Sequence, residues 1–251
     1  MNFNKTCIFK SSRRFILSIS LLFILILSID AQASLREGLS GWLKMDEGTG
    51  TVTTTDSSGN GNSGALQNSP TWAAGKVGPY ALTLNGASTQ YINISTINVT
   101  GTTVTLSAWV KSSTGGPIFS SRTGSTGIYL GIRNGSEGWT PCADTNGKIC
   151  FGMDGGGVYR GIMSTSTVND NAWHFVTATA TDINDYTTYK IYTDGIDVSS
   201  ASSLIGGGTV VATGMNIGYN TQWNIYYTGT VDDARIYNRV LSADEIKRLY
   251  N

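Results

Sequence analysis

Carboxylates are the first residues of this chain whose spacing could support chemistry. Two carboxylates held about 5–10 Å apart can cleave a glycosidic bond by acid–base or nucleophilic catalysis. After residue 33 the glutamates are Glu37, Glu47, Glu137 and Glu245. Glu47 lies in a turn, Glu245 in a helix cap and Glu137 alone in a loop, so none of them starts a run of carboxylates on one face of a strand. We therefore predict that the chain has no catalytic residues and is not an enzyme.

His174 is the only histidine in the chain. It follows Trp173 and alternates with Val176 in a strand-like run, and no spacing argues for a Ser–His–Asp triad. We therefore expect His174 to have a structural role.

Oxygen-bearing side chains in a glycine-rich loop could bind calcium, which takes about six to eight oxygen ligands. Asp56 and Asn60 lie in such a loop, which spans residues 56–62. Asp46 and Asp232 could converge on it because terminal strands often pair in a sandwich. The alternative is that Asp56 and Asn60 only cap turns, and that one of Asp232 and Asp233 faces inward and anchors a backbone amide. The sequence predicts at most one structural calcium ion, with no other cofactor.

Four aromatic residues in loop-like segments could stack on a sugar ring. These ligand-binding candidates are Trp139, Trp223, Tyr226 and Tyr159. Packing under a loop is the alternative for each of them. Four other tryptophans stand in strand-like runs, where we expect them in the core: Trp42, Trp72, Trp109 and Trp173.

The cysteines predict one disulfide. Cys7 lies in the N-terminal segment, which leaves Cys142 and Cys150 as a close pair. A three-residue loop over 145–147 would put Cys142 directly opposite Cys150 in a hairpin, within disulfide reach. Two free thiols are the alternative, and the single histidine disfavours a zinc site.

Alternating apolar residues indicate the elements that must position these groups. Val104, Leu106, Ala108 and Val110 alternate with polar or aromatic neighbours, and Val176, Ala178 and Ala180 do the same. Such runs predict antiparallel strands, separated by hairpin-type dipeptides. These turn signals include Asn85-Gly86, Asp154-Gly155 and Asp194-Gly195. The sequence therefore predicts an all-β, two-sheet antiparallel sandwich.

The last residues predict a strand followed by the one convincing helix. The strand runs from Thr230 to Tyr237. Ser242 and Glu245 then form a capping box, and Ile246, Leu249 and Tyr250 follow at helical spacing. A helix this short must dock on the sandwich to be stable.

The N-terminal segment is typical of a signal peptide. Basic residues precede the apolar run Phe15–Ile29, and Ala31-Gln32-Ala33 resembles a cleavage site. We predict a signal peptide over 1–33 and a domain over 34–251; an uncleaved membrane anchor is the alternative. The domain would be slightly acidic, without a basic run, which argues against nucleic acid as a partner.

Several motifs resemble one family in the same order along the chain. They are the segments 39–50, 56–64, 75–86, 107–111, 173–176, 192–195 and 229–250. The family is the LamG-like jelly roll of the concanavalin A-like lectin/glucanase superfamily (laminin G-like). The resemblance implies a jelly-roll fold over residues 39–250 and, as in some members, a disulfide. Leu84 departs from it, because an aromatic residue is usual there.

Members of this family are mostly non-catalytic modules of secreted proteins that bind glycans or other surface partners. The resemblance therefore implies a secreted or cell-surface module that binds a polysaccharide or glycoprotein. A structural or adhesion module that binds another protein is the alternative, and a glycoside hydrolase is a distant third. The glycosylation sequons at Asn93, Asn98 and Asn134 would matter only in a eukaryotic secretory route.

Overall fold

The computed structural model describes residues 34–50, 52–99, 101–123, 126–135, 142, 146–156, 159–200, 203–205, 210 and 212–251. The predicted signal peptide and Trp139 lie outside these ranges. Residues Gly38–Asn251 form one unit by their contacts. In the described ranges no helix is long and apolar enough to cross a membrane.

Two antiparallel sheets make up this unit, as the alternating pattern predicts. The first sheet has the order β4 (Thr71–Ala74), β5 (Tyr80–Leu84), β18 (Thr228–Tyr237), β7 (Val104–Thr123), β11 (Trp173–Ala180), β12 (Tyr189–Thr193) and β13 (Ile196–Asp197). Strand β1 (Leu39–Leu43) extends it beside β18.

The second sheet has the order β14 (Ser203–Ile205), β10 (Tyr159–Thr167), β9 (Lys148–Gly155), β8 (Thr126–Ile132), β7, β15 (Ala212–Ile217), β6 (Tyr91–Val99), β3 (Gly64–Gln67) and β2 (Thr53–Thr54). A short hairpin, β16 (Tyr219–Asn220) and β17 (Ile225–Tyr226), follows β15. Short 3-10 turns in the described ranges include η1 (Gly86–Ser88) and η3 (Tyr186–Thr188). The jelly-roll sandwich is thus confirmed.

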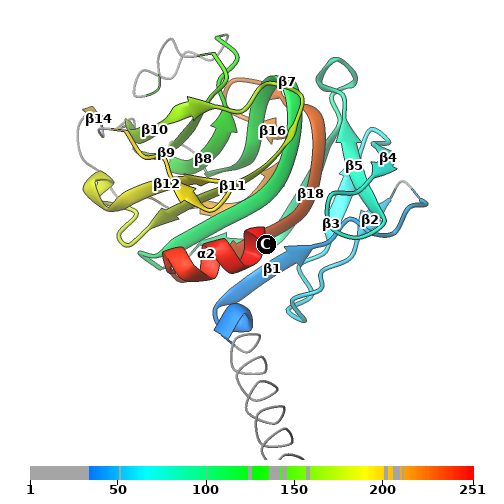
Figure 1. Cartoon of the computed structure of the whole chain (residues 1–251), viewed down its shortest axis with the longest axis horizontal. Coiled ribbons are helices and arrows are strands. Elements are labelled where there is room, and N and C mark those ends of the chain that lie inside the picture. The colour runs from blue at the N-terminus through cyan, green and yellow to red at the C-terminus, as the bar shows by residue number, and fades with distance from the viewer. Residues whose placement is uncertain are drawn as a thin grey trace, which may run out of the picture. The chain divides into compact units, whose positions relative to one another are not determined.

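Strand β7 belongs to both sheets and bends between them (Figure 1). The bend lies at Gly115 and Gly116, whose φ angles of 101° and 119° favour glycine. A Cβ atom on Gly115 would also lie 2.7 Å from the carbonyl oxygen of Ile132. Both the backbone angle and the close neighbour therefore require a residue without a side chain.

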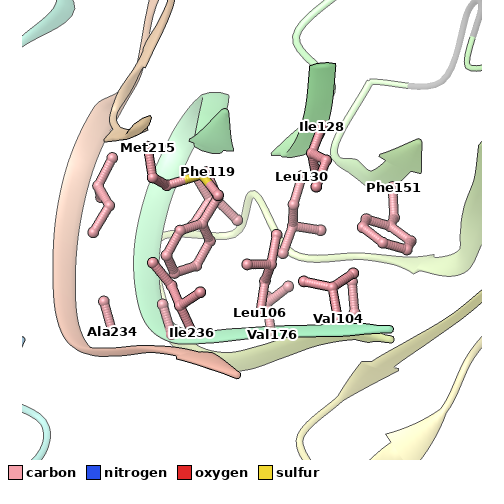
Figure 2. Packing of buried hydrophobic residues seen from close by; sticks show 14 of the residues in the cluster. Val104, Leu106, Phe119, Ile128, Leu130, Phe151, Val176, Met215, Ala234 and Ile236 are labelled. Carbon is pink, nitrogen blue, oxygen red and sulfur yellow. The ribbon is translucent and has the colours of Figure 1, made fainter. Parts of the chain in front are cut away.

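The core fills the space between the sheets. Figure 2 shows Val104, Leu106 and Val176 of the first sheet facing Leu130 and Phe151 of the second. All five side chains are buried, and the inward residues of β7 and β11 are the ones that the alternation predicts. Packing of this kind, at about 25 cal/mol per Å² of apolar surface, drives the two sheets together.

Helix α2 (Ala243–Tyr250) covers the outer side of the first sheet. Its capping box forms as predicted: Ser242 Oγ accepts from the amide of Glu245, and the Glu245 carboxylate accepts from the amide of Ser242. Ile246 and Leu249 pack against Trp109, Phe175 and Tyr237. The helix therefore buries its apolar face on the sheet.

The turn predictions have mixed outcomes. Asp194 and Gly195 connect β12 to β13 with φ angles of 53° and 77°, as a two-residue hairpin turn requires. Asn85 instead caps η1 by accepting a hydrogen bond from Ala87, and Asp154-Gly155 lies within β9. The prediction of hairpin turns at these two dipeptides is wrong, because Asn-Gly and Asp-Gly favour several kinds of turn and not only the hairpin turn.

Candidate functional site

The β16–β17 hairpin places Trp223 over the outer face of the second sheet. The side-chain oxygen of Asn220 accepts hydrogen bonds from the amides of Gln222 and Trp223, at 3.0 and 3.2 Å, and so fixes the turn. The indole of Trp223 meets the ring of Tyr129 in β8 edge to face, with centroids 6.1 Å apart. A loop side chain is thereby held against a strand.

Tyr159, at the start of β10, joins the same group. Its hydroxyl accepts a hydrogen bond from the side-chain amide of Gln222 at 3.3 Å. Trp223, Tyr129 and Tyr159 together form what we call the aromatic wall. The structure thus brings together two of the predicted ligand-binding residues, Trp223 and Tyr159.

Two neighbouring hollows open beside the aromatic wall. The smaller is narrow and is lined by Ser121, Gly127, Ile128, Tyr129, Asp154, Asn220, Gln222 and Trp223. The larger is lined by Asn93, Ser95, Ser121, Thr213, Gly214, Met215, Asn216 and Thr221. Ser121 borders both. Their polar lining is hydroxyl and amide groups with one carboxylate, a set that can donate to and accept from the hydroxyls of a sugar.

Tyr226 does not line either hollow. It stacks on Tyr219 with centroids 4.4 Å apart, and Tyr91 packs against both rings. The side-chain oxygen of Asn224 accepts from both stacked hydroxyls, at 3.3 Å each. Burial, followed by the hydrogen bond with Tyr219, raises the pKa of Tyr226. This predicted ligand residue therefore belongs to a separate tyrosine cluster, while the predicted Trp139 lies outside the described residues.

The predicted disulfide between Cys142 and Cys150 is present, with Cα atoms 5.9 Å apart. The predicted hairpin register is wrong. Cys150 lies in the interior of the sheet, opposite Gly131 in β8 and Met163 in β10. Cys142 comes from the connection between β8 and β9, so the bond ties a connection to the sheet rather than one strand to its hairpin partner. It closes a small loop, for which the chain-entropy model gives about 2–3 kcal/mol of stability.

The loop predicted to bind calcium is held by its own hydrogen bonds. Asp56 accepts from the amides of Trp42, Ser58 and Asn62 at 2.8–2.9 Å and from the Ser58 hydroxyl at 2.7 Å. Burial alone would raise the pKa of Asp56, but these bonds outweigh it and lower the pKa. Asn60 directs its amide nitrogen at the carbonyl oxygen of Leu39, 2.7 Å away. Both side chains thus fasten the loop to β1.

Asp232 and Asp46 face a different segment. Asp232 accepts from the amides of Lys76 and Val77 at 2.7 and 2.8 Å, and Asp46 lies 3.5 Å from the amide of Tyr80. No three His, Cys, Asp or Glu side chains of the described ranges are grouped so as to hold a metal ion. The four predicted ligands thus make contacts with two different segments, and calcium binding stays a prediction for titration.

The prediction that Asp232 and Asp233 face opposite ways is wrong. A β-bulge lies between the pairs Asp232–Trp109 and Arg235–Ser107, and Asp233 has a φ angle of 48°. Asp233 accepts from the indole of Trp42 at 2.5 Å and forms an ion pair with Arg235. Because the bulge adds one residue, both carboxylates point away from the core between the sheets.

The remaining titratable candidates are used in structural contacts. Glu47 accepts from Thr54 and Thr55, and Glu245 caps α2 and pairs with Arg239. His174 lies between Asp194 and Asp170, at 2.9 and 3.1 Å. Burial lowers the pKa of His174, but the hydrogen bonds to these carboxylates outweigh it and raise the pKa above its ordinary value.

Sequence reasoning missed Tyr129. A signal was present, since Gly127 and Gly131 flank Tyr129 at a spacing of two on the same strand. Glycines that alternate with an aromatic residue on one face indicate a place where another group approaches the sheet closely. A Cβ atom on Gly131 would collide with the hydroxyl of Tyr129, which shows that the tyrosine ring lies over this glycine.

Comparisons with known proteins agree on the fold. The sequence model of a family described as the Concanavalin A-like lectin/glucanases superfamily matches residues 84–247. Domain 4 of AbnA, a GH43 extracellular arabinanase from Geobacillus stearothermophilus solved in complex with arabinotriose, is 19% identical with a TM-score of 0.64. That alignment covers 85% of this chain and 98% of the other. No curated protein matches the chain.

Toxin binding domains share the same architecture. The binding domain of botulinum neurotoxin DC has been solved in complex with SialylT (14% identity) and with rat synaptotagmin II (15% identity), in both cases with a TM-score of 0.63. Each alignment covers 86% of this chain and 52% of the other, so this chain spans about half of those domains. At such identities the likeness shows the fold alone.

Proposed function

This chain belongs to the concanavalin A-like lectin/glucanases superfamily, and from that premise we propose that it is a non-catalytic module that binds carbohydrate. We place the binding site at the two hollows beside the aromatic wall. The predicted signal peptide would direct the module to the cell surface or outside the cell.

One observation carries the proposal: an aromatic wall stands beside hydroxyl and amide groups on the outer face of a sheet. The ring of Trp223 offers an apolar face for the C–H groups of a sugar, and its neighbours offer hydrogen bonds to sugar hydroxyls. Asn93 and Asn216 extend the polar surface through a mutual hydrogen bond of 2.8 Å. Glu47 and Glu245 form hydrogen bonds with Thr55 and Arg239, away from the hollows, which supports binding without hydrolysis.

The structural neighbours support this choice of ligand. Domain 4 of the arabinanase was solved with arabinotriose, and the botulinum domain with a sialylated glycan. Both domains share the fold of this chain. Arabinotriose is therefore a rational first probe.

The test is a glycan array on the chain from Ser34 onward, followed by calorimetry with the strongest ligand and with arabinotriose. We expect Trp223→Ala to weaken binding roughly tenfold or more, which corresponds to about 1.4 kcal/mol. Tyr80→Ala is the matched control, because Tyr80 is an exposed aromatic residue of the first sheet. Equal affinities for the two variants would rule out the aromatic wall as the site.

A protein ligand is the second candidate function. The botulinum neighbour solved with synaptotagmin II is the observation that favours it, since that complex uses the same fold. A chain that binds no glycan on the array, yet is captured by a defined surface protein independently of Trp223, would replace the carbohydrate proposal with this one.

A further inference from the structure

The Cys142–Cys150 disulfide lies in the same packing cluster as the aromatic wall. Both cysteines are fully buried, and together with Tyr129 they form one cluster. Trp223 and Tyr159, each half-buried, pack against this cluster. Side chains from β8, β10 and the β16–β17 turn therefore pack into one cluster that contains the disulfide.

The second sheet leaves space for this arrangement. Cys150 lies opposite Gly131, and the ring of Tyr129 occupies the place where a side chain of Gly131 would stand. The missing side chain brings the tyrosine ring next to the disulfide. A disulfide and an aromatic ring thus share the face on which Trp223 packs.

The bond links a connection to the interior of the second sheet. Cys142 lies in the connection between β8 and β9, with its sulfur 3.7 Å from the carbonyl oxygen of Ile162 in β10. Without the bond the two sulfur atoms would separate, and the cluster against which the aromatic rings pack would lose some of its contacts. The aromatic wall would then lose part of the surface that fixes its position.

We propose that the Cys142–Cys150 disulfide is a positioning element of the binding site, which holds Tyr129 and Trp223 where they line the smaller hollow. The bond acts on the site through the aromatic rings and does not touch the ligand. The effect of the disulfide on ligand affinity rests on the proposed function, whereas its effect on the position of Trp223 does not.

The first test needs no ligand. A disulfide quenches a nearby indole by accepting an electron from its excited state, so Trp223 should fluoresce weakly in the intact chain. We expect the double variant C142S/C150S to have stronger tryptophan emission with its maximum shifted to longer wavelength, because Trp223 becomes more exposed, and we expect Trp223→Phe to abolish both changes. An unshifted maximum, or an equal shift in the Trp223→Phe background, would overturn the proposal. The variant C142A/C150A serves for the same comparison if the serine pair does not fold.

The second test measures affinity for the strongest array ligand at a temperature where every variant is folded. Leu249→Ala is the matched control, because it removes packing of α2 on the first sheet, on the other side of the sandwich. We expect C142S/C150S to bind at least fivefold more weakly than the control. Equal affinities would contradict a positioning role. If the intact chain binds no glycan, the proposed function fails, and the fluorescence result still decides this inference.

Discussion

The two carboxylate oxygens of Asp232 have different surroundings. One accepts hydrogen bonds from the amides of Lys76 and Val77, while the other is buried without a hydrogen-bond partner in the described part of the chain. Burial, assisted by the neighbouring charge of Asp233, raises the pKa of Asp232 from 3.8 to about 6. The folded chain therefore binds this proton more tightly than the unfolded chain does.

The sign of the effect on stability follows from linkage. A raised pKa stabilises the fold fully below pH 3.8, and this contribution is lost as the pH rises through about 6. In Asp232→Asn the side chain cannot ionise, but its oxygen can still accept from the same two amides. We expect the stability difference between the intact chain and this variant to fall by up to about 3 kcal/mol between pH 4 and pH 7.

Urea unfolding at a series of pH values measures this difference directly. Asp244→Asn in the first turn of α2 is a control, because Asp244 is exposed. Parallel profiles for the intact chain and Asp232→Asn would contradict the prediction.

At the scale of the element, the bend of β7 carries the sharpest prediction. Gly115 combines a positive φ angle with a carbonyl oxygen close to where a Cβ atom would stand. Gly135 has a φ angle of 81°, but no heavy atom of the described residues lies within 4 Å of that point. Comparing substitutions at the two positions therefore distinguishes the cost of backbone strain from the cost of steric crowding.

We expect Gly115→Ala to lower the free energy of unfolding by about 3 kcal/mol or more, because it adds a clash to the strain. Gly135→Ala should cost only about 1 kcal/mol, from strain alone. Chemical denaturation of the two variants checks this ranking. Equal losses would mean that the crowding at Gly115 is relieved by small movements.

The elements were largely predictable, because their signals are local. Alternation over 104–110 and 176–180 gave the right strands and inward faces, and the Ser242–Glu245 capping box gave the right helix start. The disulfide pair was predictable from cysteine count. The strand register around Cys150 was not predictable. Cys150 lies between β8 and β10, and this pairing depends on the order of strands in the whole sheet.

At the scale of the molecule, β7 is the only described strand that lies in both sheets. It pairs with β11 and β18 in one sheet and with β8 and β15 in the other. Either sheet would lose a central strand if the other unfolded. We therefore expect the domain to unfold in one cooperative transition.

Calorimetry checks this expectation by comparing the measured enthalpy with the van't Hoff enthalpy of the same transition. The two should agree, and circular dichroism and tryptophan fluorescence should report the same midpoint. Two separate transitions would show that the sheets are held together more weakly than the shared strand implies.

The candidate site was only partly predictable at this scale. Trp223 and Tyr159 were identified as aromatic residues in loop-like segments, but they lie more than 60 positions apart and meet only through the fold. Tyr226, close to Trp223 in sequence, belongs to another cluster. Whether loop aromatics converge depends on which strands become neighbours, which no local pattern encodes.

The bulge at Asp233 also changes which side of the sheet the later residues of β18 face. Val231, Ala234 and Ile236 all belong to the core, although the first two are three positions apart in a structure whose side chains alternate with period two. If residue 233 took a regular extended conformation, every later residue of the strand would change sides. Arg235 and Tyr237 would then point into the core, and Ala234 and Ile236 outward. A β-branched residue at 233, which resists a positive φ angle, therefore threatens the orientation of the whole end of the strand and not one contact alone.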